Sequence, residues 1–159
     1  MNRRDLQDAL QNTNVTAFLK AIRLGEGTLD DYGYKRIVGG DVFSDFSKHP
    51  NQRVFIPRYD VYSTAAGAYQ IIFPTWSNLV HQYAFPDFSP TSQDEAAVAL
   101  IAGRHALQDV IDGHFVDAVQ KCSAEWASLP GAKAGQRIEA MENVRQVYLV
   151  SGGTISESA

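Results

Sequence analysis

A glutamate occupies a position where the pattern of an amphipathic helix calls for an apolar residue. Apolar side chains recur at the spacing of one helix face over residues 15–22, and the next position on that face is Glu26. Burial penalises a charged carboxylate, so apolar surroundings favour the protonated form of a carboxyl group. A carboxylic acid that is protonated near neutral pH is the general acid that cleavage of a glycosidic bond requires. The alternative interpretation is a glutamate at a helix end that faces solvent.

Hydrolysis of a glycosidic bond usually requires a second carboxylate across the scissile bond. Four aspartates are available downstream of the glutamate, namely Asp30, Asp31, Asp41 and Asp45. None is distinguished by its local pattern, because aspartates in loops are mostly turn or capping residues. A substrate-assisted route needs no second carboxylate, since the 2-acetamido group of the sugar takes that role. The residues alone leave both routes open.

The segment 63–70, with the sequence STAAGAYQ, is the second candidate for ligand binding. Small residues followed by tyrosine and glutamine suit a strand-to-helix turn that lines a groove. The glycine would allow close approach of the backbone, the tyrosine would offer a flat face to a sugar ring, and the glutamine would supply a donor and an acceptor. The alternative is a tightly packed turn around a core tyrosine. The residues expected to contact a ligand are Ser63, Thr64, Gly67, Tyr69 and Gln70.

Other catalytic chemistries lack their signatures in this sequence. The histidines are scattered, no two of them have metal-ligand spacing on one helix face, and no His-Glu-x-x-His motif occurs. We therefore expect no metal site. Cys122 has no partner for an internal disulfide, and its apolar neighbours predict a buried thiol that acts as a small hydrophobe. No phosphate-binding glycine loop, nucleophile elbow or dinucleotide fingerprint is present.

The composition is that of a globular protein with one domain. The chain has 159 residues, of which 45% are hydrophobic and 20% are charged, and we expect a single domain over residues 1–159. The formal net charge of -4 argues against a partner with a phosphate backbone, so we expect no nucleic acid ligand. No stretch approaches the about 20 apolar residues of a membrane span, and no secretory signal is seen. We therefore expect synthesis in the cytoplasm.

The glutamate is carried by the first predicted helix, which extends over about residues 13–27. Thr13 or Asn14 is expected to be its N-cap, and Gly25 and Gly27 are expected to mark its end. The dozen residues before this helix are mostly polar and are expected to be loose.

A small β lobe is expected over about residues 31–70, where glycine, aspartate, serine and aromatic residues are frequent. Candidate strands are residues 36–38, residues 42–43 and a piece near 59–63. The Gly-Gly-Asp sequence at 39–41 is a good hairpin turn between the first two.

Helical patterns return after the β lobe and continue to a loose tail. Helices are expected over residues 73–83, 89–110, 115–126 and about 136–149, separated by glycine and proline breaks. The predicted fold is therefore α+β and mostly helical. Its helical lobe comprises residues 13–27 and 74–150, and a cleft separates that lobe from the small β lobe.

Short blocks along the chain are similar to those of one known family. In order, they are EGT at 26–28, GY at 33–34, IVGG at 37–40, FSD at 43–45, HP at 49–50, ST at 63–64, AG at 66–67, YQ at 69–70, DFSP at 87–90, SQD at 92–94, CS at 122–123 and WASLPGA at 126–132. Each block is weak alone, but together and in this order they are quite specific. The chain resembles the endolysins of lambda-type phages, which are lysozyme-like lytic transglycosylases.

The resemblance implies a two-lobed lysozyme-like fold in which Glu26 is the catalytic acid. The family cleaves the β-1,4 bond between N-acetylmuramic acid and N-acetylglucosamine, and the 6-hydroxyl of the sugar replaces water, which leaves 1,6-anhydro ends. No cofactor is involved. Two loops that form lips over the groove map to about residues 51–62 and 130–140. Tyr34 and Trp126 lie in matching blocks, and we expect both to contact substrate. The alternative for Trp126 is a core position, because it lies on the apolar stripe of a predicted helix.

Several positions depart from the family pattern. The loop after the catalytic glutamate is shorter, Lys35 replaces an aspartate, Ala68 replaces an arginine, and positions 133–134 read Lys-Ala where Gly-Tyr is expected. Related phage hydrolases have glutamate, aspartate and threonine with eight and then five residues between them. That spacing meets Lys35 and Asp41 here, so the hydrolase triad is absent.

The expected function is cleavage of peptidoglycan during bacterial cell lysis. The chain is expected to act as a monomer in the periplasm and to recognise the anionic cell wall through sugar contacts rather than through bulk charge. Three alternatives remain open: a muramidase-type hydrolase that uses water, a hydrolase of chitin-like polymers, and a phage component that binds glycan without cutting it.

Overall fold

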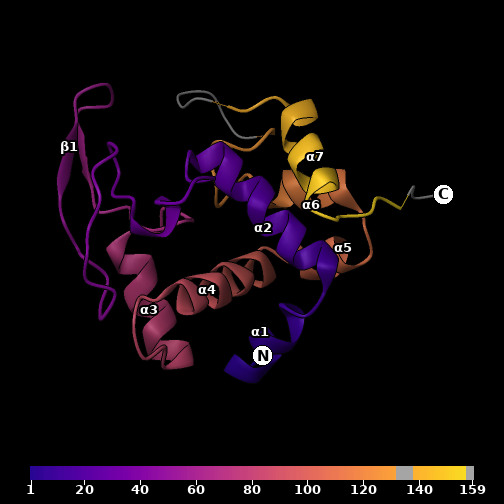
Figure 1. The fold of residues 1–159 in the computed structure, drawn as a ribbon, viewed down its shortest axis with the longest axis horizontal. Helices are drawn as coiled ribbons and strands as arrows, with labels where there is room; N and C mark the ends of the chain where they lie inside the picture. Colours follow the sequence, from indigo (N-terminus) through magenta and orange to yellow (C-terminus); the bar gives the residue numbers. More distant parts are fainter. Residues whose placement is uncertain (132–137, 157–159) are drawn as a thin grey trace.

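The chain folds into a mostly helical structure with one small antiparallel sheet, which confirms the α+β expectation. The structure is a computed structural model, and it describes residues 1–131 and 138–156. Its elements are α1 (Arg3–Ala9), α2 (Thr13–Glu26), the 3-10 helix η1 (Gly33–Lys35), β1 (Val54–Ile56), β2 (Val61–Ser63), α3 (Phe73–Tyr83), α4 (Pro90–Gly103), α5 (Leu107–Ile111), α6 (Phe115–Cys122) and α7 (Met141–Val150). Figure 1 shows the hairpin at one end of the molecule and helices α5 to α7 at the other.

Helix α2 runs through the middle of the molecule, where it contacts α4, α5 and α7 (Figure 1). Its predicted apolar face is buried, and Phe18 packs edge-on against Phe115 and Tyr148 at centroid distances of 6.1 and 6.4 Å. Each side chain of this type contributes about 1.5–3 kcal/mol when it is fully buried. The helix that carries Glu26 is therefore anchored in the core along most of its length.

The ends of α2 explain where Glu26 lies. The N-cap is Asn12, whose side chain accepts hydrogen bonds from two backbone amides, so the N-cap predicted at Thr13 or Asn14 was placed too late. Gly27 ends the helix in the left-handed conformation, with φ of 72°, which is the backbone state that glycine adopts at low cost. Glu26 is consequently the last residue of the helix, with its side chain half-buried.

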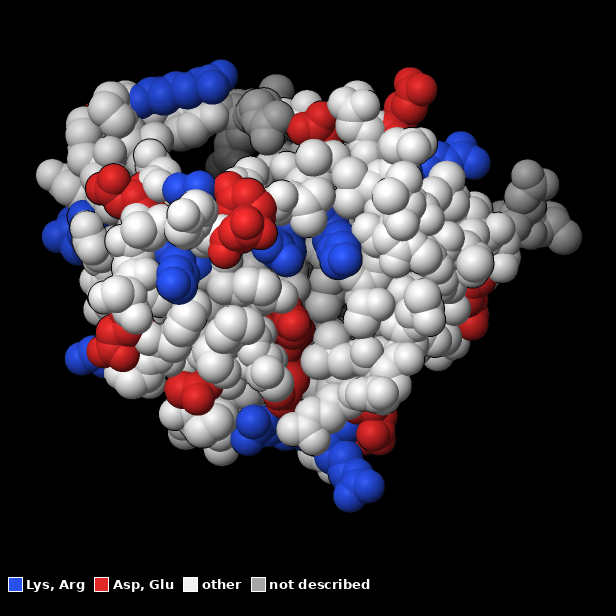
Figure 2. Space-filling view, in the orientation of Figure 1, with Lys and Arg blue, Asp and Glu red and all other residues white. Residues whose placement is uncertain are grey.

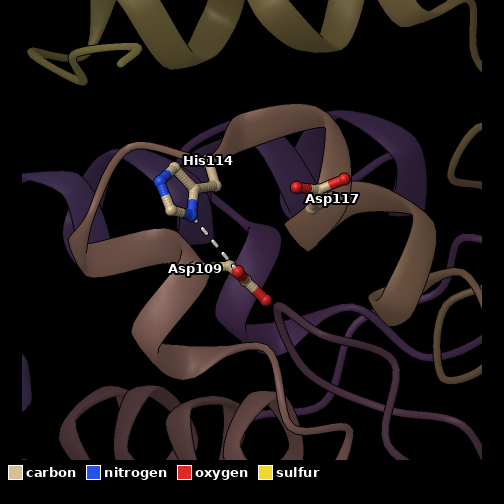
Figure 3. Close-up of side chains that lie close together, drawn as sticks. All are labelled: Asp109, His114 and Asp117. Atoms are coloured by element: carbon tan, nitrogen blue, oxygen red, sulfur yellow. Dashed lines mark hydrogen bonds and ion pairs between the residues drawn. The ribbon is translucent and has the colours of Figure 1, made fainter. Parts of the chain in front are cut away.

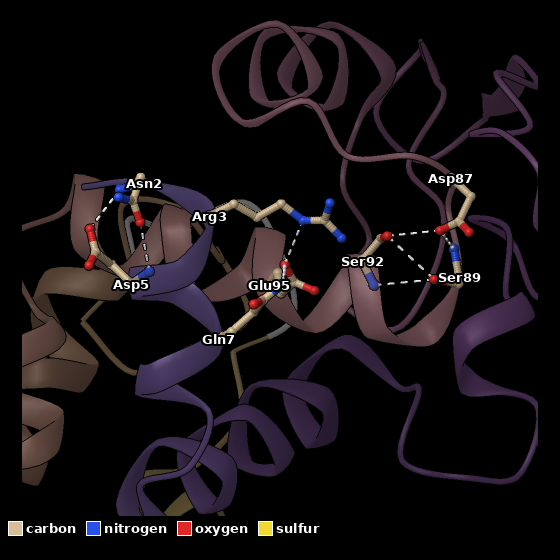
Figure 4. A network of polar contacts seen from close by, with 8 residues as sticks. All are labelled: Asn2, Arg3, Asp5, Gln7, Asp87, Ser89, Ser92 and Glu95. Carbon is tan, nitrogen blue, oxygen red and sulfur yellow. Dashed lines mark hydrogen bonds and ion pairs between the residues drawn. The ribbon is translucent and has the colours of Figure 1, made fainter.

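The N-terminal segment is a helix, which contradicts the expectation that the first dozen residues are loose. Asn2 and Asp5 form a capping box at the start of α1, and Leu6 is fully buried. Glu95 of α4 is buried too, and it accepts hydrogen bonds from Arg3 and Gln7 (Figure 4). Most residues of α1 are polar and Leu6 is its one fully buried side chain, so the local pattern gave little indication of a helix.

The described part of the C-terminal tail is also fixed, although looseness was expected. The amide of Thr154 donates to the Asn14 side chain at 2.9 Å, and Tyr148 donates its hydroxyl to the Thr154 carbonyl at 2.7 Å. The amide of Ser156 donates to the carbonyl of Gly113 at 3.0 Å. These bonds hold the tail against the start of α2 and the α5–α6 turn.

The β region contains one true hairpin rather than three strands along the expected positions. β1 and β2 pair antiparallel with Phe55 opposite Tyr62, so the strand expected near 59–63 is confirmed at its C-terminal end. The strands expected at 36–38 and 42–43 are wrong, since this stretch makes only isolated bridges, such as Arg36 to Val42 and Ile37 to Ala66. Two successive glycines with positive φ turn the chain before a ladder of backbone bonds can form.

The later helices are confirmed, with shorter bounds. The helix expected over 89–110 is divided into α4 and α5, because His105 adopts a positive φ of 58° that interrupts the helical turn. α6 ends at Cys122, so Trp126 lies beyond it. α7 begins at Met141 rather than near 136, and residues 132–137 lie outside the described part of the chain. Among the described residues, no helix is both long and apolar enough to cross a membrane.

His49 illustrates how the β region is attached to the core. Its Nε2 donates to the Ile71 carbonyl at 2.8 Å, its Nδ1 accepts from the Asn51 amide at 2.9 Å, and its ring packs 4.8 Å from that of Phe88. This arrangement requires a neutral imidazole, and burial holds the pKa of His49 below its ordinary value of 6.5.

We therefore expect the free energy of unfolding to decrease as the pH falls below 6.5 towards the lowered pKa of His49. In that window the unfolded chain binds a proton that the folded chain rejects, so protonation favours unfolding. Denaturant unfolding between about pH 7 and pH 5 measures the slope for the natural chain and for His49→Gln, which cannot titrate. Equal slopes in the two proteins would contradict this account.

Candidate active site

Glu26 opens into a cavity of about 220 Å³ at the end of α2. On its other side the Ser128 hydroxyl lies 3.4 Å from Oε2 of Glu26, at the outer limit of a hydrogen bond. Gly25 makes this approach possible, because a Cβ at that position would lie 2.6 Å from the Ser128 oxygen. The carboxyl group is thus held between the buried segment around Ser128 and an open cavity, where a ligand can reach it.

The rest of the cavity wall comes from the chain just after α2 and from the β region. Gly27 and Thr28 follow Glu26 directly, and the β region contributes Arg36, Ile37, Gly39, Gly40 and Gln70. The side-chain amide of Gln70 donates to the Gly67 carbonyl at 2.8 Å and to the Arg36 carbonyl at 3.2 Å, which fixes its orientation. The structure therefore brings two predicted site residues, Glu26 and Gln70, to one cavity.

No second carboxylate lines this cavity among the described residues. The nearest candidate in sequence, Asp30, pairs with Arg36 at 2.9 Å, and the hydrogen bond from that guanidinium lowers the pKa of Asp30. Asp31, Asp41 and Asp45 are exposed and do not line the cavity. A reaction in this cavity therefore has one carboxyl group, Glu26, and one cation, Arg36, within its walls.

Two further hollows continue from the cavity along the same part of the chain. Gln70 also lines a hollow of about 150 Å³ that includes Tyr69 and Trp126. Ile72 belongs to that hollow and also to a third one of about 330 Å³, which includes Ser63 and Thr64. The shared residues make the three hollows neighbours, and they form a row that begins at Glu26. The predicted ligand contacts that line this row are Ser63, Thr64, Tyr69, Gln70 and Trp126, whereas Gly67 and Tyr34 line none of the three hollows.

A larger open hollow of about 480 Å³ lies elsewhere, between Tyr32, Lys35, Phe43 and Pro50. It contains neither Glu26 nor Gln70, and its carboxylate, Asp45, is exposed. Size alone therefore does not identify the candidate site, and the choice of the smaller cavity rests on the half-buried Glu26 in its wall.

The aromatic residues Tyr69 and Trp126 are core residues, so their rings do not offer the exposed sugar-binding faces that were expected. Each side chain is only 2% exposed. The Trp126 indole donates to the Tyr69 carbonyl at 3.0 Å, and the Tyr69 hydroxyl donates to Asp94 at 2.6 Å. They form the back wall of the second hollow, where they hold the backbone of residues 69 and 70 in place.

Asp94 is the centre of a polar network that sequence reasoning missed. Its Oδ1 accepts from Tyr69 at 2.6 Å and from Tyr34 at 2.8 Å, and burial raises the pKa of Asp94. The pKa of Tyr34 is raised to about 12, chiefly by burial, so this phenol stays protonated and donates. The guanidinium of Arg23 lies 4.7 Å above the Tyr34 ring. Tyr34 is therefore a positioning residue that joins α2, α4 and the β region, rather than an exposed sugar contact.

Gly67 has a structural reason for its place in the STAAGAYQ segment. Its φ is 83°, and a Cβ would lie 2.4 Å from the side-chain oxygen of Gln93. That oxygen accepts from the Ala68 amide at 2.8 Å. The glycine thus admits a buried side chain of α4, which fixes the turn that leads to Gln70.

Ser63 and Thr64 use their hydroxyl oxygens to accept backbone hydrogen bonds. Ser63 accepts from the Ala65 amide at 3.2 Å, and Thr64 accepts from the Phe73 amide at 2.8 Å. Each hydroxyl still has its own hydrogen to donate, because accepting a bond does not use it. Both residues line the third hollow, at some remove from the cavity of Glu26.

One group of possible metal ligands lies between α5 and α6, although no metal site was expected. Ligand atoms of Asp109, His114 and Asp117 lie within 4.8 Å of one another (Figure 3). Lys121 already pairs with Asp109 at 2.6 Å and supplies the positive charge that this carboxylate requires. The cluster is explained as an ion-pair network. Nearby, Cys122 is buried, and burial raises the pKa of its thiol to about 12, which confirms the expected inert thiol.

Comparisons with known proteins agree with this architecture. The Endolysin family model matches residues 16–155. The endolysin of Escherichia phage P2 is 39% identical over 155 aligned residues, which cover 88% of this chain and 93% of the relative. The endolysin of Escherichia phage lambda is 37% identical over 153 aligned residues, which cover 92% of this chain and 96% of the relative.

Solved structures give the same result. Bacteriophage lambda lysozyme in complex with a chitohexasaccharide superimposes with a TM-score of 0.85 at 36% identity, covering 91% of this chain and 97% of that one. A second structure of lysozyme from bacteriophage lambda gives a TM-score of 0.82 at 35% identity over the same shares of the two chains. These likenesses confirm the expected lysozyme-like fold.

Proposed function

The chain belongs to the endolysin family, the lysozyme-like enzymes of phages, and from that membership we propose that it cleaves peptidoglycan glycan strands with Glu26 as the catalytic acid. One observation carries the role of Glu26. It is the single carboxylate among the described residues that line the cavity at the end of α2. A related structure, that of lambda lysozyme, holds a chitohexasaccharide, which supports a glycan as the ligand here.

We further propose that the reaction is a transglycosylation within one sugar. Glu26 first donates its proton to the oxygen that leaves as the bond to C1 of N-acetylmuramic acid breaks. The sugar's acetamido group stabilises the positive charge at C1. The ionised Glu26 then takes the proton of the sugar's own 6-hydroxyl as that oxygen bonds to C1. The acid is regenerated, and the product carries a 1,6-anhydro end.

The environment of the aspartates supports this route over hydrolysis. An inverting hydrolase needs a second carboxylate to activate water, and a retaining one needs it as a nucleophile. Asp30 is held in an ion pair with Arg36, and the positions of the hydrolase triad are occupied by Lys35 and exposed Asp41. The guanidinium of Arg36 and the side-chain oxygen of Gln70 line the cavity instead, which supports a role for both in binding polar groups of the substrate.

Mass spectrometry of digested peptidoglycan is expected to show 1,6-anhydromuramic ends. Replacement of Asp30, Asp31, Asp41 or Asp45 by asparagine, one at a time, is expected to cost much less activity than loss of Glu26. Reducing muramic ends alone, or one aspartate variant as inactive as a Glu26 variant, would establish a two-carboxylate muramidase instead. Tight glycan binding without any product would establish a non-catalytic glycan-binding component.

The proposed setting is lysis of a bacterial host. The enzyme is made in the host cytoplasm and acts as a monomer on the cell wall from the periplasm. Glycan units are proposed to follow the row of hollows from Glu26 past Gln70 to Ser63 and Thr64.

A further inference from the structure

The third hollow, which contains Ser63 and Thr64, has a cationic and aromatic wall formed by the β1–β2 hairpin and the residue before it. Arg53 and Tyr62 line it on the hairpin side, and the guanidinium carbon of Arg53 lies 4.5 Å from the centre of the Tyr62 ring. The ring itself packs 5.2 Å from that of Phe55 and is 60% exposed. Stacking orders the long arginine side chain, and it leaves the N–H groups in the guanidinium plane available to a ligand.

The polar groups of this hollow are mainly hydrogen-bond donors. Ser63 and Thr64 accept backbone hydrogen bonds, and neither hydroxyl hydrogen is used towards another described residue. Arg53 pairs with no carboxylate in the described part of the chain, and no carboxylate lines the hollow. A pocket that presents a guanidinium and two hydroxyl donors fits an anionic acceptor, and a guanidinium pairs best with a planar carboxylate.

The charge of the hairpin region differs from that of the whole chain. The formal net charge of the protein is -4, whereas residues 51–63 contain two arginines, Arg53 and Arg58, and one acid, Asp60. Figure 2 shows Lys and Arg side chains along the upper left edge of the molecule, where Figure 1 places the hairpin. The hairpin region is therefore net cationic in a protein that is acidic overall, which suits an acidic ligand.

We propose that the hairpin pocket binds a free carboxylate of the peptide stem that peptidoglycan carries on its muramic acid residues. The inference rests on the proposed function, because the pocket is the last of the row of hollows that starts at Glu26. A stem peptide is an acidic ligand attached to the glycan strand, so its carboxylate reaches Arg53 when the strand occupies the row. The hairpin then selects peptide-bearing strands over bare glycan.

The test compares two substrates, glycan strands with intact stem peptides and the same strands stripped of peptides by an amidase. The measured quantity is the ratio of kcat/KM for peptide-bearing strands to kcat/KM for bare strands. We expect the natural enzyme to favour peptide-bearing strands, and Arg53→Gln to lower the ratio by about two- to fivefold, the scale of one exposed ion pair. The loss should shrink at high salt, which screens exposed charges.

Arg58→Gln is the matched control. It removes the same charge from the same hairpin, but Arg58 stacks over Tyr59 at 5.5 Å and does not line the pocket. It is expected to keep the natural ratio. The proposal that this pocket binds a carboxylate would be wrong if Arg53→Gln kept the natural kcat/KM ratio, or if Arg58→Gln lowered that ratio as much as Arg53→Gln does.

Binding of both strands is measured alongside cleavage, so that the two proposals fail separately. If the natural protein cuts neither strand, the proposed function fails, and the affinity ratio still decides the inference. If Arg53→Gln loses affinity for peptide-bearing strands but not for bare strands, the result supports the carboxylate pocket. If Arg53→Gln and the natural protein bind peptide-bearing strands with equal affinity, the result rejects it.

Discussion

Glu26→Gln is expected to abolish lysis while the fold stays intact. Glutamine keeps the shape of the side chain at the end of α2, but it has no proton of suitable acidity to give to the leaving oxygen. The loss of rate should reach at least about 100-fold, which is the lower scale of general acid catalysis. Clearing of a suspension of outer-membrane-permeabilised cells measures the rate, and circular dichroism and the melting temperature report the fold.

A control at a second glutamate is Glu142→Gln. Glu142 is exposed in the first turn of α7, and it lines none of the hollows described above. Its replacement should leave most of the lytic rate, because it lies neither at the cavity of Glu26 nor along the proposed path of the glycan. A well-folded Glu26→Gln protein that retains lysis would remove Glu26 from its role.

Asp94→Ala is expected to destabilise the protein by about 3 kcal/mol, because it leaves two partly or fully buried tyrosine hydroxyls without their acceptor. For a domain of this size that corresponds to a decrease in Tm of roughly 10 °C. The change should act on stability first, since Asp94 does not line the cavity of Glu26. Denaturant unfolding and calorimetry measure the effect. A loss below about 0.5 kcal/mol, the scale of an ordinary surface substitution, would mean that the network contributes little.

Asp94→Asn separates the hydrogen bonds from the charge. The amide oxygen of asparagine can still accept from Tyr34 and Tyr69, so the loss of stability should be much smaller than for alanine. Because burial raises the pKa of Asp94 above 3.8, its stabilising contribution is complete below that pH and is lost as the pH rises through the raised pKa. This part of the pH dependence of stability should disappear in the asparagine variant. If it persists there, a group other than Asp94 causes it.

The position of Glu26 and the helix that carries it could be predicted from the sequence because their signals are local. The helical period places Glu26 on the same face as the buried residues of α2, and Gly27 ends that helix as expected. The α+β class follows from the same kind of pattern, since apolar spacing together with proline and glycine breaks predicts the helical region that contains α3 to α7. Local periodicity reports contacts within one or two turns, and these elements are built from such contacts.

The role of the tyrosines was decided by tertiary structure. Tyr34 and Asp94 are 60 positions apart, and Tyr69 and Asp94 are 25 apart, so no local pattern links them. An aromatic residue beside a small-residue turn suits a sugar platform and a core position equally well. The acceptor from α4 settles the choice, because a tyrosine whose hydroxyl has a buried partner can be buried without an unpaired donor.

The sequence by itself determined the position of Glu26 on the buried face of a helix, the end of that helix and the class of fold, because each depends on residues within a few positions of one another. Only the tertiary structure decided which carboxylates remain beside Glu26. Asp30 pairs with Arg36 and does not line the cavity, whereas Gln70 is brought to the cavity by the fold. It also formed the Arg53 pocket from a hairpin whose residues show no chemistry in isolation. These arrangements depend on segments that come into contact only when the β region packs against the helices. Spacing along the chain does not predict such contacts.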